Sequence, residues 1–293
     1  FSMSDSLSAL RKKISRAHDL HAVVKTMKAA AASSIGLYEQ AQHALSTYTR
    51  TLELGLSRCF GDISFDQSSQ YINKASIDTV IIGSDQGLVG QFNDSIVDFA
   101  IHELSQNYHD INVWVIGERA LMRLEHQAIS IVKYYPVPSS LKMITPFINE
   151  LLIDFDKHGI LTNSNNQLVI FYNKLEKSSF YTQTKSIVLP LDFAWLLRTQ
   201  SIKWPTRYIP EVFCSLPLSR QKLLQEFVFI SLYNACIASL ASENMSRMMA
   251  MQRAEKNISE LIDILRNTFH RLRKEGIDAE LFDVIAGFES LLH

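Results

Sequence analysis

The feature that most constrains the fold is a proline-free stretch at the start of the chain, from Asp5 to about Cys59. Apolar or small residues recur there at alternating spacings of three and four positions, which is the heptad pattern of a coiled-coil helix. The members of this seam are Leu7, Leu10, Ile14, Ala17, His21, Val24, Lys28, Ala31, Ile35, Tyr38, Gln42, Leu45, Thr49, Leu52 and Leu56. Such a helix would be roughly 80 Å long. It therefore needs a partner helix of similar length.

A second proline-free stretch extends from Ser219 to about Leu291 and also carries apolar residues at helical spacing. They are Leu223, Phe227, Ile230, Ile237, Met245, Met248, Ile258, Leu261, Leu265, Phe269, Leu272, Leu281, Ile285 and Phe288. We predict a helix with Ser219 as its N-cap, and Gly276 is the expected position of any break. The two terminal helices are expected to pack against each other, antiparallel, as a rod.

The segment between these helices, from about Gly61 to Pro217, has a different pattern in which short apolar runs alternate with helical segments. The expected strands are Asp78–Ile82, Ile111–Ile116, Ile129–Val132, Gln167–Tyr172 and Lys185–Leu189, and the expected helices are Asp94–Gln106, Arg119–His126 and Lys142–His158. This alternation indicates an open, mostly parallel sheet. A turn is expected at Asn163–Asn166 and an irregular connector at Leu196–Pro210.

These patterns predict three domains. Residues 1–60 form an N-terminal coiled-coil helix, residues 61–218 an α/β domain, and residues 219–293 a C-terminal coiled-coil helix. The formal net charge of −1 gives no basic field that would favour nucleic acid. No uninterrupted apolar run approaches the ~18–20 residues that cross a bilayer, so no direct membrane insertion is expected.

Neither a metal site nor a catalytic site is expected. Cys59, Cys214 and Cys236 are far apart, without metal-ligand spacing, and are interpreted as reduced and buried. The nine histidines show no ligand spacing. The sequence contains no G-x-S-x-G, H-E-x-x-H or C-x-x-C motif.

The stretch "IIGSDQGLVGQFN" places Gly83, Gly87 and Gly90 between a β-branched run and a helix, where α/β proteins bind phosphate groups. The glycine spacing, however, fits neither the dinucleotide fingerprint nor the P-loop, and no lysine follows. The favoured interpretation is a structural turn with close packing between helix and strand.

Three helical stretches are candidates for contact with another protein. In Val23–Ser34, Lys25 and Lys28 lie among small residues, which suits either a partner contact or a tight crossing of the terminal helices. In Leu240–Asn257, methionines cover about half of a helix face, which suits either core packing or an adaptable interface. The basic cluster Arg266–Glu275 is either a solvated face or a contact to an acidic neighbour.

Three ordered blocks of residues carry a resemblance to a known family. The first block is Lys25, Met27, Lys28, Ala31, Ala32 and Ser33, the second is Ser84, Asp85, Gly87, Leu88, Gly90, Phe92 and Asn93, and the third is Ser242, Glu243, Arg247, Met248, Ala250, Met251, Ala254 and Asn257. In these blocks the chain resembles the gamma subunit of F-type ATP synthases. The chain departs from the family pattern at Ala29, Ala30, Ser34, Gln86, Val89, Gln91, His270 and Asp278. These departures suggest a divergent paralogue from an alternative bacterial F-type (N-type) ATPase.

The resemblance implies an antiparallel coiled coil of N- and C-terminal helices with a Rossmann-like α/β domain inserted between them, without a cofactor. It also implies a rotor stalk that couples ion flow to ATP synthesis or hydrolysis. The implied partners are the alpha and beta subunits of the catalytic hexamer, the epsilon subunit and the c-ring. The implied location is the cytoplasmic face of the bacterial plasma membrane, as a peripheral protein. The implied hexamer contacts are Lys25, Met27, Lys28, Glu243, Arg247, Met248, Met251 and Gln252.

Two other functions fit parts of the pattern. One is a nucleotide-dependent α/β enzyme with coiled-coil dimerisation arms, which would bind its ligand at Gly83–Gly90. The other is a coiled-coil scaffold, which would form a homodimer through the terminal helices.

Overall fold

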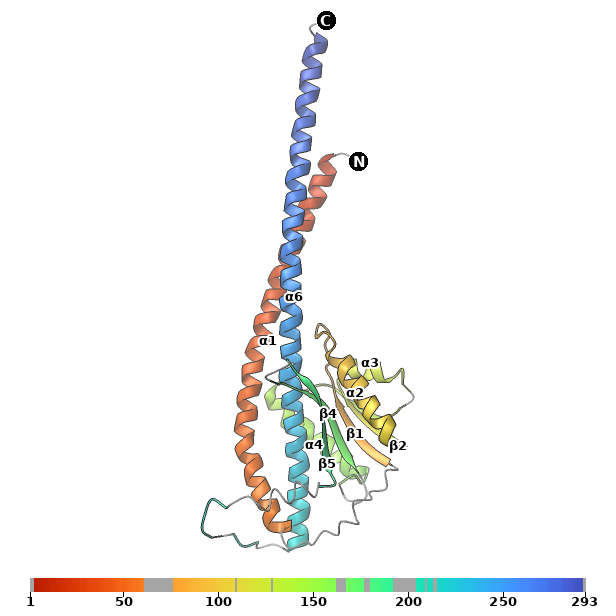
Figure 1. Cartoon of the computed structure of the whole chain (residues 1–293), viewed down its shortest axis with the longest axis vertical. Helices are drawn as coiled ribbons and strands as arrows, with labels where there is room; N and C mark the ends of the chain where they lie inside the picture. The colour runs from red at the N-terminus through yellow and green to blue at the C-terminus, as the bar shows by residue number, and fades with distance from the viewer. Residues whose placement is uncertain are drawn as a thin grey trace. The chain divides into compact units, whose positions relative to one another are not determined.

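A computed structural model of the chain describes residues 3–60, 76–108, 110–127, 129–161, 167–176, 180–191, 204–208, 210–212 and 215–291. Its elements are α1 (Met3–Phe60), β1 (Ser76–Ile82), α2 (Phe92–Asn107), β2 (Asp110–Ile116), α3 (Glu118–Leu124), β3 (Ser130–Tyr135), α4 (Leu141–Lys157), β4 (Leu168–Lys174), β5 (Thr182–Leu189) and α6 (Leu216–Leu291) (Figure 1). The expected fold class, long terminal helices around an α/β sheet, is confirmed.

The described chain forms two compact units, and both long helices contribute to each. One unit, here called the helical unit, combines α1 up to Ala31 with α6 from Arg247 onward. The other, here called the sheet unit, contains residues 32–246 and therefore the whole sheet. The predicted domain boundaries at 60/61 and 218/219 lie near the ends of the long helices, not at the borders of these compact units. The division into three domains stays a prediction.

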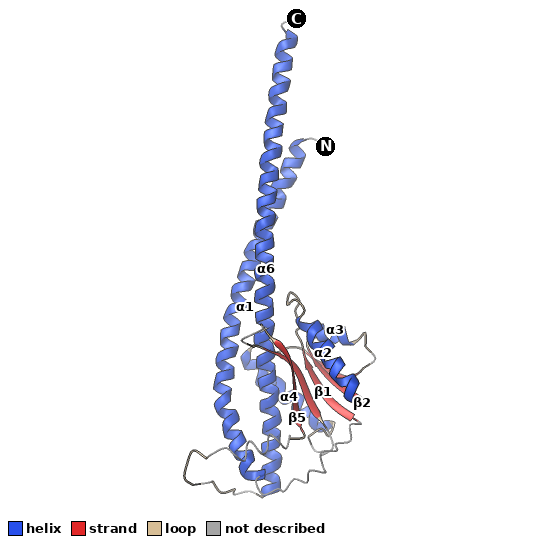
Figure 2. Cartoon of the chain, in the orientation of Figure 1, coloured by secondary structure: helices blue, strands red, loops and turns tan. Residues whose placement is uncertain are grey.

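The five strands, coloured red in Figure 2, belong to one sheet. Their order is β3-β2-β1-β4-β5. The pairs β1–β2, β1–β4 and β2–β3 are parallel, and β5 pairs with β4 antiparallel. All five expected strands and all three expected helices of this region are present, with ends that differ by a few residues. The mostly parallel sheet follows from β-branched strands that alternate with helices.

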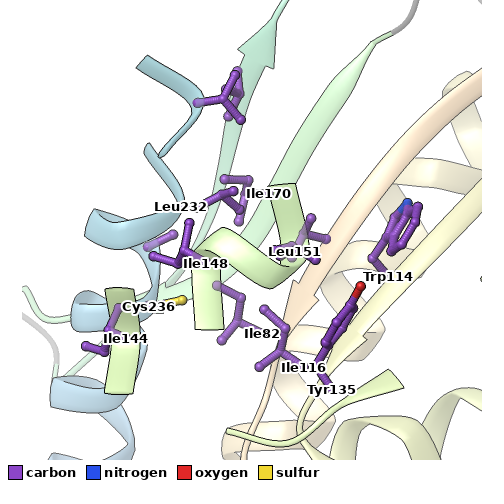
Figure 3. Close-up of a cluster of buried hydrophobic side chains, with 14 of the residues drawn as sticks. Ile82, Trp114, Ile116, Tyr135, Ile144, Ile148, Leu151, Ile170, Leu232 and Cys236 are labelled. Carbon is purple, nitrogen blue, oxygen red and sulfur yellow. The ribbon is translucent and has the colours of Figure 1, made fainter. Parts of the chain in front are cut away.

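Both faces of the sheet are covered by helices. Residues on one face, such as Ile81 and Val115, pack with α2 and α3 in one buried cluster. Residues on the other face, such as Ile82 and Ile116, pack with α4 and α6 in a larger cluster that also contains Tyr38 of α1. Figure 3 shows the second cluster, where Ile144 and Ile148 of α4 lie beside Cys236 and Leu232 of α6. Because neighbouring residues of a strand point to opposite faces of the sheet, a single apolar strand supplies side chains to both clusters.

The heptad seam predicted for α1 is confirmed. None of its members is exposed, and Ala17, Val24, Ala31, Ile35, Tyr38, Leu52 and Leu56 are fully buried. In the sheet unit, α1 runs antiparallel to α6, because Tyr48 donates a hydrogen bond to Glu226 and the backbone carbonyl of Cys59 accepts one from Arg220.

The start of the C-terminal helix differs from the prediction, and the possible break at Gly276 is absent. The helix begins at Leu216 rather than after a Ser219 N-cap, because Pro217 is tolerated in the first helical turn. It also continues through Gly276 without a break. Gly276 costs helix stability but does not end the helix.

Several sequence expectations concern residues outside the described part of the chain. The turn at 163–166, most of the connector at 196–210, and Cys214 lie there, as does the side chain of Phe288. Cys59 and Cys236 are buried free thiols, as predicted. Burial raises the pKa of the Cys236 thiol to about 12, which leaves it unreactive.

Among the described helices, one contains a window long and apolar enough to cross a membrane, by length and composition alone. This helix is α6, and half of the window is buried inside the protein. Its residues Val228, Leu232 and Ile237 belong to the sheet-unit core. The apolar character of this part of α6 is therefore explained by packing on the sheet.

The core of the sheet unit predicts a contrast between two isoleucines of α4. Ile148 is fully buried, whereas Ile153 is 57% exposed. Ile148→Ala is expected to lower the free energy of unfolding by about 2–5 kcal/mol, through lost burial and a cavity. The matched control Ile153→Ala is expected to change it by less than about 0.5 kcal/mol. Urea unfolding of the purified chain measures both, and equal losses would contradict the assigned core.

Candidate functional site

The glycine loop follows β1 and joins it to α2, as the sequence predicted. A Cβ atom at Gly83 would lie 2.5 Å from the Cβ of Ala120 and 2.7 Å from Oδ1 of Asn93, so no side chain fits. Gly90 has φ of 58°, a conformation that favours glycine. At Gly87 a Cβ atom would meet only Arg119, no nearer than 3.7 Å. Packing therefore explains Gly83 and backbone conformation explains Gly90, but neither explains Gly87.

The loop is held by the chain's own polar groups. The carboxylate of Asp85 accepts hydrogen bonds from the backbone N–H of Glu118, at 3.0 Å, and of Val137, at 2.9 Å. Oδ1 of Asn93 accepts a hydrogen bond from the backbone N–H of Ser84, at 2.9 Å. Asp85 therefore places a negative charge at the start of α3, beside the carboxyl ends of the parallel strands. A phosphate there would be repelled, so the geometry supports a structural turn.

Leu88, at the tip of the same loop, is a feature that sequence reasoning missed. Its φ is 63°, and its side chain is 62% exposed. A leucine with positive φ is strained, and such strain concentrates at functional positions. The signal in the sequence was only that Leu88 matches one of the resembling blocks.

The predicted contact residues of the helical unit divide into packed and exposed members. Met251 is 3% exposed and forms a buried cluster with Ala17, Val24, Ile258 and Ile262, against which Met27 packs. Arg247 and Met248 are half-buried, while Lys25 and Gln252 are exposed. The structure thus brings Met27 and Met251 together across the helix pair. It leaves Lys25 and Gln252 as the side chains most accessible to another protein.

Glu243 belongs to the sheet unit, where its side chain is 7% exposed. The subunit contact that the resemblance implied for Glu243 stays a prediction.

Lys28 is engaged inside the chain. Its Nζ donates to a carboxylate oxygen of Glu255 on α6, and both side chains are partly buried. Lys28, followed by the smaller effects of His21 and Lys25, lowers the pKa of the Glu255 carboxyl from its ordinary value. The sequence pattern left open whether Lys28 lies in a partner contact or in a tight crossing of the terminal helices. It did not identify Glu255 as the partner, because Glu255 lies far away along the chain.

The remaining contacts of the helical unit fix its antiparallel arrangement. Residue 28 of α1 faces residue 255 of α6, His18 hydrogen-bonds Arg266, and the guanidinium of Arg11 lies 5.3 Å from the ring centroid of Phe269. Residues of α1 thus meet α6 in reverse order. In the basic cluster, Arg273 and Lys274 are exposed, which agrees with a solvated face.

The end of α6 carries an exposed apolar surface. Continuing the antiparallel register places the start of α1, at Met3, opposite about residues 277–281 of α6. Leu281 and Ile285, expected in the seam, lie at or beyond this level and are 57% and 46% exposed. Phe282 and Val284 are exposed as well. An apolar surface of this kind marks an interaction site.

Comparisons with known proteins agree with this arrangement. The sequence model of a family described as ATP synthase matches residues 6–291. The ATP synthase gamma chain of Ehrlichia ruminantium (strain Gardel) is 30% identical over 224 residues, which cover 75% of each chain. This chain belongs to the ATP synthase gamma chain family. The gamma chain of Wolbachia sp. subsp. Drosophila simulans (strain wRi) is 27% identical over 298 residues, covering 97% of this chain and 100% of the relative.

Solved structures with the same fold include other ATP synthase components. A chain of the Euglena gracilis mitochondrial ATP synthase (OSCP/F1/c-ring) superposes with a TM-score of 0.67 and 19% identity, covering 98% of this chain and 95% of the other. A chain from the central stalk and c-ring structure of the Tetrahymena thermophila mitochondrial ATP synthase gives a TM-score of 0.54 and 22% identity, covering 79% and 99%. Among the described residues, no group of three or more histidine, cysteine or acidic side chains could hold a metal ion.

The Lys28–Glu255 pair predicts a charge-swap result. Lys28→Glu or Glu255→Lys alone places like charges opposite each other and should lower the midpoint of thermal unfolding, while the double swap should restore most of the loss. Because the folded-state pKa of Glu255 is lowered, the stabilisation is present above the ordinary carboxyl pKa and is lost as the pH falls through the folded value. Additive losses in the double swap, measured by calorimetry at pH 7, would show that the pair does not interact.

Proposed function

We propose that this chain is the central rotor stalk of an F-type ATPase, and that its paired helices form the shaft. As a member of the gamma chain family, it works with the alpha and beta subunits of the catalytic hexamer, the epsilon subunit and the c-ring. The observation that carries the proposal is the antiparallel pairing of α1 and α6 in a chain that matches the family from residue 6 to 291. In this proposal residues 1–60 and 219–293 supply the two helices of the shaft, and residues 61–218 form the α/β domain between them.

The mechanism is mechanical. Ion flow through the membrane sector turns the c-ring, and the c-ring turns this chain. The outward side chains of the helix pair are not equivalent, since the exposed Lys25 of α1 is charged whereas the exposed Gln252 of α6 is neutral. A rotating shaft with unequal faces presents a different surface to each catalytic subunit at each angle. Differential contact then shifts each catalytic site between conformations of different affinity.

The chain contributes surfaces rather than chemistry to this cycle. In the glycine loop, the carboxylate of Asp85 accepts hydrogen bonds from backbone N–H groups that could otherwise bind a phosphate. This supports a structural role for the loop, without a nucleotide. Catalysis belongs to the hexamer, and this subunit is non-catalytic. The proposed location is the cytoplasmic face of a bacterial plasma membrane, as a peripheral protein, in a complex of the alternative N-type.

The contact surface is proposed to centre on Lys25, Met27 and Gln252, with Arg247 and Met248 as half-buried neighbours. Lys28 and Met251 support this surface from within, through the ion pair to Glu255 and the buried cluster. Glu243 is proposed to act from within the sheet unit, where its side chain is buried. The exposed apolar end of α6, around Phe282, is proposed as a second contact with the hexamer.

The rotor function predicts a crosslinking result. In the assembled complex, a cysteine at Gln252 or Lys25, joined to a beta subunit by a short bifunctional reagent, should reduce ATP hydrolysis in proportion to the crosslinked fraction. The reason is that the shaft can then no longer turn. Multisite ATPase activity is the measurement, and cleavage of a reducible linker should restore it.

A cysteine at the exposed Arg58, at the other end of α1, is the matched control and should not be linked to a beta subunit by the same reagent. Full activity in a completely crosslinked Gln252→Cys complex would contradict the rotor function.

A further inference from the structure

Two serine side chains of α6 hold the helix to the α/β sheet region by buried hydrogen bonds. The hydroxyl of Ser242 lies within hydrogen-bond distance of two backbone carbonyl oxygens, that of Asn173 at 3.1 Å and that of Ala238, one turn earlier in the helix, at 2.8 Å. Its one proton is shared between these two acceptors. The hydroxyl of Ser246 donates to the backbone carbonyl oxygen of Val89, at 2.5 Å. The two serines are 0% and 7% exposed. We call these two serines and their acceptor carbonyls the serine latch.

The acceptors of the latch are themselves connected. Val89 lies in the glycine loop, and Asn173 lies near the end of β4. The side-chain amide of Asn173 donates to the backbone carbonyl of Phe92, the first residue of α2, at 3.1 Å. The next residue, Asn93, ties the same turn back to Ser84. The latch therefore joins α6 to the glycine loop, to β4 and to the start of α2 at once.

The spacing of the latch determines which movements it resists. Ser242 and Ser246 are four residues apart and lie on one face of the helix. Rotating α6 by one residue turns this face by 100°, and sliding α6 by one residue moves it by about 1.5 Å. Either movement separates both hydroxyls from their acceptors and leaves buried carbonyl groups without partners, which is costly. The close packing of α6 against the sheet resists the same movements, and the latch adds directional contacts to that packing.

We propose that Ser242 and Ser246 are positioning residues that transmit torque between the α/β domain and α6. This inference rests on the proposed rotor function. Helix α6 continues without a break from the latch to Leu291, so a turn applied to the sheet region passes through the latch into the helix. Both serines are buried within this chain, and the latch acts by preventing slip within the rotor.

The test uses the complete ATP synthase in sealed membrane vesicles. The variants are Ser242→Ala/Ser246→Ala, and Ser239→Ala as the matched control. Ser239 lies on the same helix and is 1% exposed, and its hydroxyl has no hydrogen-bond partner in the described structure. ATP hydrolysis, the ion gradient formed per ATP hydrolysed, and the amount of chain in the assembled complex are measured together.

The latch predicts that the double variant assembles and hydrolyses ATP but forms a several-fold smaller gradient per ATP, while Ser239→Ala behaves as the unmodified complex. A purely structural role would instead lower hydrolysis and pumping in step with the amount of assembled complex. An unchanged gradient per ATP in the assembled double variant would overturn the proposal.

Where the double alanine variant does not assemble, Ser242→Thr/Ser246→Thr decides the matter, because it keeps both hydroxyls. Normal assembly and pumping by the threonine variant would support the proposal that the hydrogen bonds of the latch transmit torque. Failure of both the alanine and the threonine variants would overturn the proposal. The rotor function is tested separately by complexes from which this chain has been removed. ATP-driven pumping without the chain would contradict the rotor function itself, independently of the latch.

Discussion

The structure depends on the burial of one continuous apolar seam along α1. A single long helix cannot remain stable in water with such a stripe exposed, because helix propensity alone supplies little free energy. In both units the seam is buried with the help of α6, first by residues such as Ile230 and then by Met251 and Ile258. The ends of the polypeptide are thereby held together, although the whole α/β sheet lies between them in the sequence.

The same constraint explains the residues at the helix pair. Small residues and methionines allow two long helices to approach closely, and the ion pair between Lys28 and Glu255 adds a directional contact. In the described part of the chain, apolar side chains near the far end of α6, such as Leu281 and Phe282, are exposed. A rotor stalk that turns inside the catalytic hexamer needs a buried seam that holds its two helices together and outward side chains that contact the hexamer.

Much of this architecture could be predicted from the sequence. The seam, all five strands and the three helices of the sheet region were read from periodicity, because burial imposes a period of two on strands and of three to four on helices. The contacts between residues that are distant in sequence could not be predicted, and the residues that contact other subunits stay a prediction. Lys28 and Glu255 are distant in sequence, and so are Ser246 and Val89, and no local pattern reports such pairs. The burial of Glu243 and the exposure of Leu281 likewise follow from tertiary packing, which hydrophobic spacing alone does not encode.

The central claim is that the paired ends of this chain turn as a shaft inside the catalytic hexamer. It is tested most directly by holding the hexamer on a surface, attaching an optical probe to the sheet region of this chain, and recording the probe during ATP hydrolysis. The account predicts unidirectional rotation that stops when ATP is removed. A probe that stays at a fixed angle while the same complexes continue to hydrolyse ATP would contradict it.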